Sequence, residues 1–364
     1  MGKLENKTKD NHYVTIYYLK TFLNENSKIY QGDLKTGIVY KKNESELKTM
    51  CEKTNIYTIK TKITDTDISR FKEIFNIDLN DKVDEDLILK LVKFLNDELA
   101  DLEPVQIKNN KVAEDEINKN LKDKINNPGI SREQESLFTL YEEDFNPVYD
   151  KILQDENISF LKQKTNEDFE SYLYKKVIRF IYKQFSKKAL YETSIQQPTF
   201  PDFVKDDYYD FLHCIIIQYF RTEKIMDIFE NILKSYSEKP AHLLFLTIHY
   251  KCIKLVCTLL NNNFKVVLIK NNSKADFITS DNPSINIYSS IVNGNLSGDE
   301  FEIYFPLSHK LAVLYSKKDC YKNIDDFTIT TEKEIDIWNN MLKDNAKRYI
   351  YGSSKSLLKR YLKK

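Results

Sequence analysis

Two apolar helical stretches constrain the fold of this 364-residue chain more than any other feature. Residues 211–220 and 243–260 carry apolar side chains around most of the circumference that a helix would present. Helices of that kind are usually buried on most faces. Apolar residues make up 41% of the chain, enough at this length for an unaided core. The sequence therefore predicts a folded protein built around a helical body.

Further helical patterns surround these two stretches. Apolar residues recur at helical spacing in segments 11–23, 84–102, 133–161, 169–191, 206–236, 240–260 and 332–351. Residues 105–131 are highly charged and close on an Asn-Asn-Pro-Gly turn signal, so they predict a charged helical excursion from the main body.

Strand patterns occupy two other places. Segments 28–30 and 38–40 flank Gly32 and Gly37, which predicts a small N-terminal β-hairpin. Short β-rich runs separated by Asn, Ser, Gly and Pro follow residue 263, at 264–270, 276–280, 300–305 and 311–315. The predicted fold class is α+β: a mainly helical body with a late antiparallel β-sheet and the N-terminal hairpin.

The charge of the chain argues against one class of function. It carries 55 basic and 55 acidic side chains, so its formal net charge is zero, and six of the basic residues are Arg. Nonspecific binding to nucleic acid requires a concentrated basic face. A generic nucleic-acid coat is therefore excluded, and only a local basic groove could bind phosphate.

Cysteine usage and the N-terminus indicate a compartment. The five Cys are odd in number and lack paired CxxC spacing, which favours free thiols in a reducing cytoplasm. The first twenty residues are charged and polar, unlike a secretory signal. We also find no long uncharged apolar stretch, so we expect no membrane partner.

Standard catalytic signatures are missing. The sequence has no GxGxxG or Walker loop, no HExxH and no GxSxG elbow. The nearest metal candidates are His249, Cys252 and Cys257, with His242 two turns earlier. Four ligands on one helix cannot surround a tetrahedral ion, so buried thiols in a core helix are the better interpretation.

Polar residues in apolar surroundings are the candidates for a site. Asn11 and His12 open the first apolar segment; Asn11 suits a helix cap, and His12 could be a general base or a donor at the core edge. Gln218 and Arg221 lie three apart inside an apolar helix, where a carboxylate or an anionic ligand would have to satisfy them. Both interpretations remain open.

Carboxylates supply the rest of the candidate set. Asp281 follows an apolar strand, and Pro283 keeps Asn282 out of helical geometry. The turn is either an ordinary Asx-turn or a fixed position for a catalytic acid or metal ligand. Glu142 and Glu143 belong to an acidic cluster that is a solvated face unless one of them turns toward Arg221.

Five ordered motifs together resemble a known family. They are NHYV with Tyr18-Leu19 and Phe22, Gln218 to Arg221-Thr222, FITSDNP at 277–283, FPLS at 305–308, and Asn339 with Tyr349-Ile350-Tyr351. The family is the bacterial domain-of-unknown-function family 4238. The resemblance runs from residue 11 to 352 and implies a single family domain over 1–364; Thr15 departs from it, because the signature has Pro there.

The resemblance implies kinship and leaves the activity open. Genes of such family members look to lie in variable gene neighbourhoods, and the resemblance therefore implies a role in phage defence or toxicity. One hypothesis is a nuclease that cleaves phosphodiesters, acting on nucleic acid or a nucleotide with a divalent metal ion as a candidate cofactor. His12, Glu143 and Asp281 would be catalytic, and Asn11, Gln218, Arg221 and Asn339 would bind substrate. The alternative is a non-catalytic binding or sensor module in which the same polar residues are structural.

Overall fold

The computed structural model describes residues 10–12, 14–54, 63–75, 89, 92, 130–165, 167–173, 175–177, 204–237, 240–288 and 301–362. The predicted charged excursion lies outside the described residues up to residue 129. The predicted helix at 84–102 lies outside them as well, except that residues 89 and 92 are helical.

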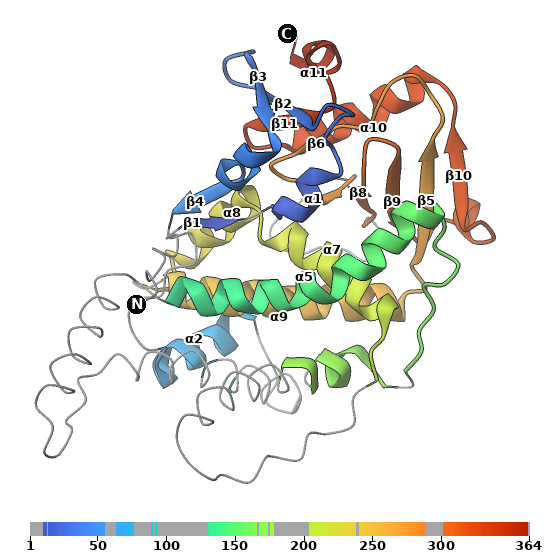
Figure 1. Cartoon of the computed structure of the whole chain (residues 1–364). Coiled ribbons are helices and arrows are strands. Elements are labelled where there is room, and N and C mark those ends of the chain that lie inside the picture. Colours follow the sequence, from blue (N-terminus) through green and yellow to red (C-terminus); the bar gives the residue numbers. More distant parts are fainter. Residues whose placement is uncertain are drawn as a thin grey trace, which may run out of the picture.

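Long helices form the body of the protein, as the sequence predicts (Figure 1). They are α2 (Asp65–Phe75), α5 (Ile130–Asp155), α7 (Asp207–Phe220), α8 (Glu223–Leu233) and α9 (Pro240–Asn261). Helix α7 packs against both α5 and α9, while α8 and α2 pack against α9. The two apolar stretches belong to α7 and α9; every side chain of residues 211–220 is buried, and those of residues 243–260 are buried or partly buried.

The single helix predicted for 206–236 is instead two helices. Helix α7 ends at Phe220 with Arg221 as its C-cap, and Thr222 adopts an extended conformation (φ −69°, ψ 147°) before α8 begins. The Thr222 hydroxyl donates a hydrogen bond to the Tyr219 carbonyl, 3.1 Å away. Thr is only mildly unfavourable inside a helix, so periodicity alone does not reveal this break.

Helix α9 qualifies by length and composition as a membrane-crossing helix over Leu243–Asn261, contrary to the sequence-based expectation. In the structure 67% of that apolar window is buried by the rest of the protein. A core helix passes the same test. Its burial identifies α9 as the central helix of the body, and the absence of a membrane partner stays a prediction.

Two larger sheets lie on the same side of the helical body (Figure 1). One is five-stranded, in the order β10 (Asp326–Ile329), β5 (Lys265–Asn271), β9 (Leu311–Ser316), β8 (Ile303–Pro306) and β7 (Ile285–Asn286). The other is four-stranded, in the order β3 (Val39–Asn43), β2 (Lys28–Asp33), β11 (Tyr349–Gly352) and β6 (Thr279–Ser280). The α+β class is thus confirmed.

The sheets differ from the prediction in detail. The hairpin forms as β2 and β3, but it continues into β11 and β6 from the end of the chain. The run 276–280 therefore belongs to this second sheet and not to the late sheet. The late sheet is mixed, because β10 pairs with β5 in parallel. The chain between these two strands, residues 272–325, includes β6 to β9, and a connection of that length permits the parallel pairing, whereas a tight hairpin turn would not.

The five-stranded sheet is buried on both faces. Val313 and Tyr315 pack with the helical body, whereas Ala312 and Leu314 pack with α10 (Glu332–Asn345) and α11 (Lys355–Leu362). Side chains alternate between the faces of a strand, so both sets must be apolar. This explains why every residue of β8 and β9 is buried.

The chain end departs from the predicted helix 332–351. Thr331 caps α10 through a capping box with Glu334, so the helix begins where expected. It ends at Asn345, because Ala346 is extended (ψ 147°), and strand β11 and helix α11 follow. A Cβ on Gly32 would lie 2.9 Å from Leu362 Cδ1, so the glycine permits α11 to approach the sheet closely.

Candidate functional site

Asp281 lies at the end of β6 and binds the backbone of the segment between α10 and β11. Its Oδ1 accepts the Lys347 amide, and its Oδ2 accepts the amides of Arg348 and Tyr349, each at 2.8 Å. Its own amide donates to the Tyr349 carbonyl at 3.0 Å. The residue is only 2% exposed. The carboxylate therefore fixes the path of the chain from α10 into β11.

This bonding limits what Asp281 can do chemically. Burial raises the pKa of the Asp281 carboxyl, while the three peptide N–H donors oppose that shift. Both oxygens already accept hydrogen bonds, so neither is presented to a substrate proton. A divalent metal ion would have to displace these amides, and the donor set therefore does not fit a metal site.

Polar side chains from three motifs meet around this turn. Lys347 Nζ forms ion pairs with Glu223 Oε1, at 2.8 Å, and with Asp227 at the start of α8. Lys224 Nζ donates to the Asn345 carbonyl at 3.0 Å, and Asn282 Nδ2 donates to the same carbonyl at 3.2 Å. The segment after Arg221-Thr222, the SDNP turn and the end of α10 are thereby tied together.

Two buried polar atoms at this turn carry no hydrogen bond within the described part of the chain. They are Asn282 Oδ1 and Ser284 Oγ. An unsatisfied buried acceptor or donor costs about 1–3 kcal/mol. This is the only part of the SDNP region with unused polar capacity among the described residues, and it is too deeply buried to meet a macromolecule directly.

Arg221 forms a buried ion pair across helices α7 and α5. Its Nη1 lies 2.5 Å from Glu142 Oε1, and its guanidinium lies 4.5 Å from the centre of the Phe138 ring. Arg221 is 1% exposed, and the Glu142 side chain is 23% exposed. Glu143 is exposed on α5. The carboxylate that meets Arg221 is therefore Glu142 and not Glu143, a choice that the sequence left open.

A second buried charge lies farther along the α5–α7 contact. Lys176 Nζ is 2.6 Å from Asp210 Oδ1 and 2.8 Å from Asp144 Oδ2. The Tyr172 hydroxyl also donates to Asp210, at 2.7 Å. The sequence analysis did not identify Lys176 or Asp210, since a single Lys or Asp at a helix position is normally solvated. Lys176 thereby bridges Asp144 of α5 and Asp210 of α7, which the Arg221–Glu142 pair also joins.

The histidines of the body lie among aromatic rings. His213 contacts Tyr141 with ring centres 4.4 Å apart, and His249 contacts Phe245 at the same separation. Burial lowers the pKa of His249 to about 3 and that of His213 well below its ordinary value. Both rings are therefore neutral at physiological pH. Within the described ranges there is no group of three or more His, Cys, Asp or Glu residues that could hold a metal ion.

Asn339 binds backbone in the core between α10 and the second sheet. Its Oδ1 accepts the Ile278 amide at 3.0 Å, and its Nδ2 donates to the Asp276 carbonyl and to the Tyr361 hydroxyl, both at 2.9 Å. The Asn339 side chain thus pairs with the backbone of the segment that leads into β6. Both N–H donors and the carbonyl oxygen of the Asn339 amide therefore have protein partners.

The N-terminal motif lies on β1 (Asp10–His12), which pairs with β4 (Glu52–Thr54). His12 is the register partner of Glu52, and the side chains of Asn11 and His12 lie outside the described residues. This corrects the predicted helix at 11–23, which forms only as α1 (Ile16–Lys20). Thr15 caps α1 by accepting the Tyr18 amide at 3.0 Å.

Helix α1 joins two other motifs. The hydroxyls of Tyr18 and Thr279 lie 2.6 Å apart, and the Thr21 hydroxyl donates to the Leu307 carbonyl at 2.7 Å. The N-terminal, FITSDNP and FPLS motifs therefore meet at α1. Gln218 is buried in α7, one turn before Arg221. The structure does not bring Asp281 and Arg221 into direct contact; each has its own partners.

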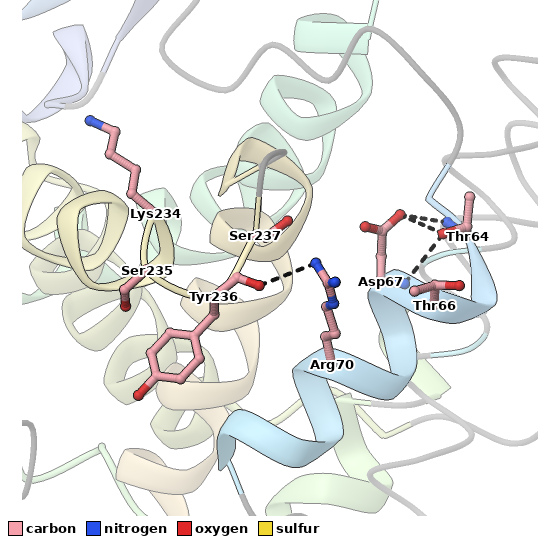
Figure 2. A pocket seen from close by; sticks show the side chains of 8 residues that line it. All are labelled: Thr64, Thr66, Asp67, Arg70, Lys234, Ser235, Tyr236 and Ser237. Carbon is pink, nitrogen blue, oxygen red and sulfur yellow. Dashed lines mark hydrogen bonds between the residues drawn. The ribbon is translucent and has the colours of Figure 1, made fainter.

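A polar cavity of about 470 Å³ lies between α2 and the end of α8 (Figure 2). Its lining residues are Thr64, Thr66, Asp67, Arg70, Lys234, Ser235, Tyr236 and Ser237. Arg70 reaches across it and donates to the Tyr236 carbonyl at 3.2 Å, while Lys234 points away from Asp67 (Figure 2). None of the predicted site residues lines this cavity.

Comparison with known families gives one match. The model of the family described as Protein of unknown function (DUF4238) matches residues 10–356, nearly the whole chain. Comparisons with curated proteins and with solved structures found no match. The family resemblance inferred from the five motifs is thereby confirmed, and the chain belongs to the DUF4238 family.

Proposed function

We propose that this chain is a non-catalytic binding module whose family motifs hold the helical body and the two sheets together. The observation that carries the proposal is the bonding of Asp281. Its two oxygens accept three peptide amides and it is buried. A catalytic site presents polar atoms to solvent, whereas a structural network is closed and satisfied.

The remaining motif residues support the same function. Arg221 is neutralised by Glu142 and covered by Phe138, and the Asn339 amide is committed to backbone. Substrate-binding groups would need to release these partners first. Breaking the buried pair at Arg221 would leave an uncompensated charge, at a cost of about 3–5 kcal/mol.

The nuclease hypothesis is the weaker candidate on this geometry. It requires Asp281 and Glu143 to act together as base or metal ligands, but Asp281 is saturated by amides and Glu143 is exposed on another element. A role in phage defence or toxicity, which the family resemblance implies, would then come from what the protein binds.

The test compares Asp281→Asn with the wild type in two assays. Purified proteins are incubated with labelled RNA and DNA in the presence of Mg²⁺ or Mn²⁺, and their thermal unfolding is followed separately. We expect no cleavage by either protein and a lower melting temperature for Asp281→Asn, because its amide group must face a peptide N–H. Glu143→Gln is the control and should unfold like the wild type.

The opposite outcome is equally specific. Wild-type cleavage that disappears in Asp281→Asn, at an unchanged melting temperature, would establish a catalytic Asp281 and overturn the binding-module proposal.

A further inference from the structure

A small cleft separates the N-terminus of α7 from the outer strands of the five-stranded sheet. Its volume is about 260 Å³. It is lined by Ile158, Ser159, Leu161, Lys162, Tyr208, Phe264, Lys265, Val266 and Asp325. None of these residues belongs to a family motif discussed above, and none contributes to the Asp281 or Arg221 networks. The cleft is therefore independent of the structural network.

The inner wall of the cleft is apolar and aromatic. Ile158, Phe264 and Val266 are buried members of the main core, so they present fixed surfaces. Tyr208 is partly buried against the same core. Aromatic and apolar walls with few polar groups are typical of sites for small molecules. Tyr208 and Phe264 are the two aromatic side chains of this lining.

A buried phenol lies close to this wall. Tyr315 is 0% exposed, and its hydroxyl has no hydrogen-bond partner among the described residues. It is the register partner of Val266 on the neighbouring strand, so both side chains lie on the same face of the sheet. Burial raises the pKa of Tyr315, and the nearby Tyr208 adds to that effect. Tyr315 therefore lies as a neutral phenol behind the wall, and Tyr208 is the phenol that lines the cleft.

The rim of the cleft carries positive charge. Lys162 is exposed and forms no ion pair with any described residue. Lys265 Nζ pairs with Asp325 at 2.9 Å. Lys317 Nζ lies 5.9 Å from the centre of the Phe264 ring. Two ammonium groups, of Lys162 and Lys265, therefore line the cleft together with one carboxylate, that of Asp325.

From this juxtaposition we propose that the cleft binds a mononucleotide, with the base against Tyr208 and Phe264 and the phosphate at the lysine rim. The inference deepens the proposed binding function and rests on it. A cavity of about 260 Å³ accommodates the base, whereas the phosphate remains at the open edge, where an ammonium group acts as a point charge. Stacking on aromatic rings is tolerant of base identity.

The experiment measures nucleotide binding to the full chain by calorimetry. The probes are AMP, GMP, CMP and UMP, with adenosine and inorganic phosphate as the two halves of the ligand. We expect at least one mononucleotide to bind with a Kd below about 1 mM, and more tightly than either half. Lys162→Glu should weaken that binding by about tenfold without changing adenosine binding, since it reverses a charge at the rim.

Controls separate this inference from the proposed function. Lys333→Glu, an exposed substitution at the start of α10, should leave nucleotide affinity unchanged. Phe264→Leu should weaken both AMP and adenosine. Binding no tighter than phosphate alone, or a Lys162→Glu affinity equal to the wild type, would overturn the nucleotide site. Chromatography of the recovered nucleotide is the second readout: an intact nucleotide agrees with binding, whereas its hydrolysis would refute the non-catalytic proposal and leave the site in place.

Discussion

Replacing Asn339 with Ala tests whether a family motif residue serves the fold or a ligand. The side chain of Asn339 makes three buried hydrogen bonds, to the Ile278 amide, the Asp276 carbonyl and the Tyr361 hydroxyl. A neutral intramolecular hydrogen bond contributes about 1 kcal/mol net, and an orphaned buried peptide group costs about 1–3 kcal/mol. Tyr361 keeps a second partner, Asp336, so the loss of its hydrogen bond with Asn339 costs little.

The two orphaned peptide groups, at about 1–3 kcal/mol each, predict that Asn339→Ala lowers the free energy of unfolding by about 2–6 kcal/mol. Urea unfolding followed by circular dichroism measures it, provided that the m-value stays constant. Asn340→Ala is a matched control one residue away. Asn340 is exposed; it donates to the Asp336 carbonyl and accepts from Lys343 Nζ, both in its own helix, so the change should be within about 0.5 kcal/mol.

A different result would refute the structural role. If Asn339→Ala unfolds within 0.5 kcal/mol of the wild type, then the three bonds contribute nothing net. If it loses ligand binding at unchanged stability, Asn339 belongs to a binding site, as the substrate-binding hypothesis assumed. Asn339→Asp retains the acceptor for Ile278 but places a carboxylate against the Asp276 carbonyl, so it should be destabilised at least as much at pH 7.

Two further predictions concern buried charges. Burial alone would raise the pKa of Asp33, but Arg348 and the amides of Lys35 and Thr36 outweigh it and lower the pKa. The folded pKa then lies below the unfolded value of about 3.9, so the stabilisation by Asp33 is present above that pH and is lost as the pH falls through the folded pKa. When unfolding is measured over this acid range, the free energy of unfolding should fall less for Asp33→Asn than for the wild type. Arg221→Ala should lower the free energy of unfolding by about 3 kcal/mol, whereas Glu143→Gln should not change it; equal effects of the two substitutions in urea unfolding would contradict the pairing of Arg221 with Glu142.

The parts of the fold that the sequence predicts well depend on local periodicity. The apolar residues of α7 and α9 surround the whole helix, and only burial inside a body can satisfy them. The β2–β3 hairpin is also local, since Gly37 takes a positive φ of 71° in its turn. Both elements form where the sequence places them.

The parts that it predicts poorly depend on partners distant in sequence. Strand β11 lies between β2 and β6, more than 300 and about 70 residues away respectively, and Tyr349–Gly352 alone reads equally well as the end of an amphipathic helix. The carboxylate of Asp281 ends that helix by binding the amides of 347–349. Such a tertiary contact overrides local propensity and leaves no periodic signal.

The same reasoning explains why the motif residues suggested chemistry. A sequence shows that Asp281, Arg221 and Asn339 are polar groups in apolar surroundings, which holds for catalytic groups and for structural ones. What separates the two is whether the bonding capacity is used, and that depends on backbone atoms such as the Arg348 and Ile278 amides, which any residue type supplies. The ligand site proposed above accordingly lies where the motifs are not: in the cleft lined by Tyr208, Phe264 and Lys162, whose ammonium group forms no ion pair with any described residue.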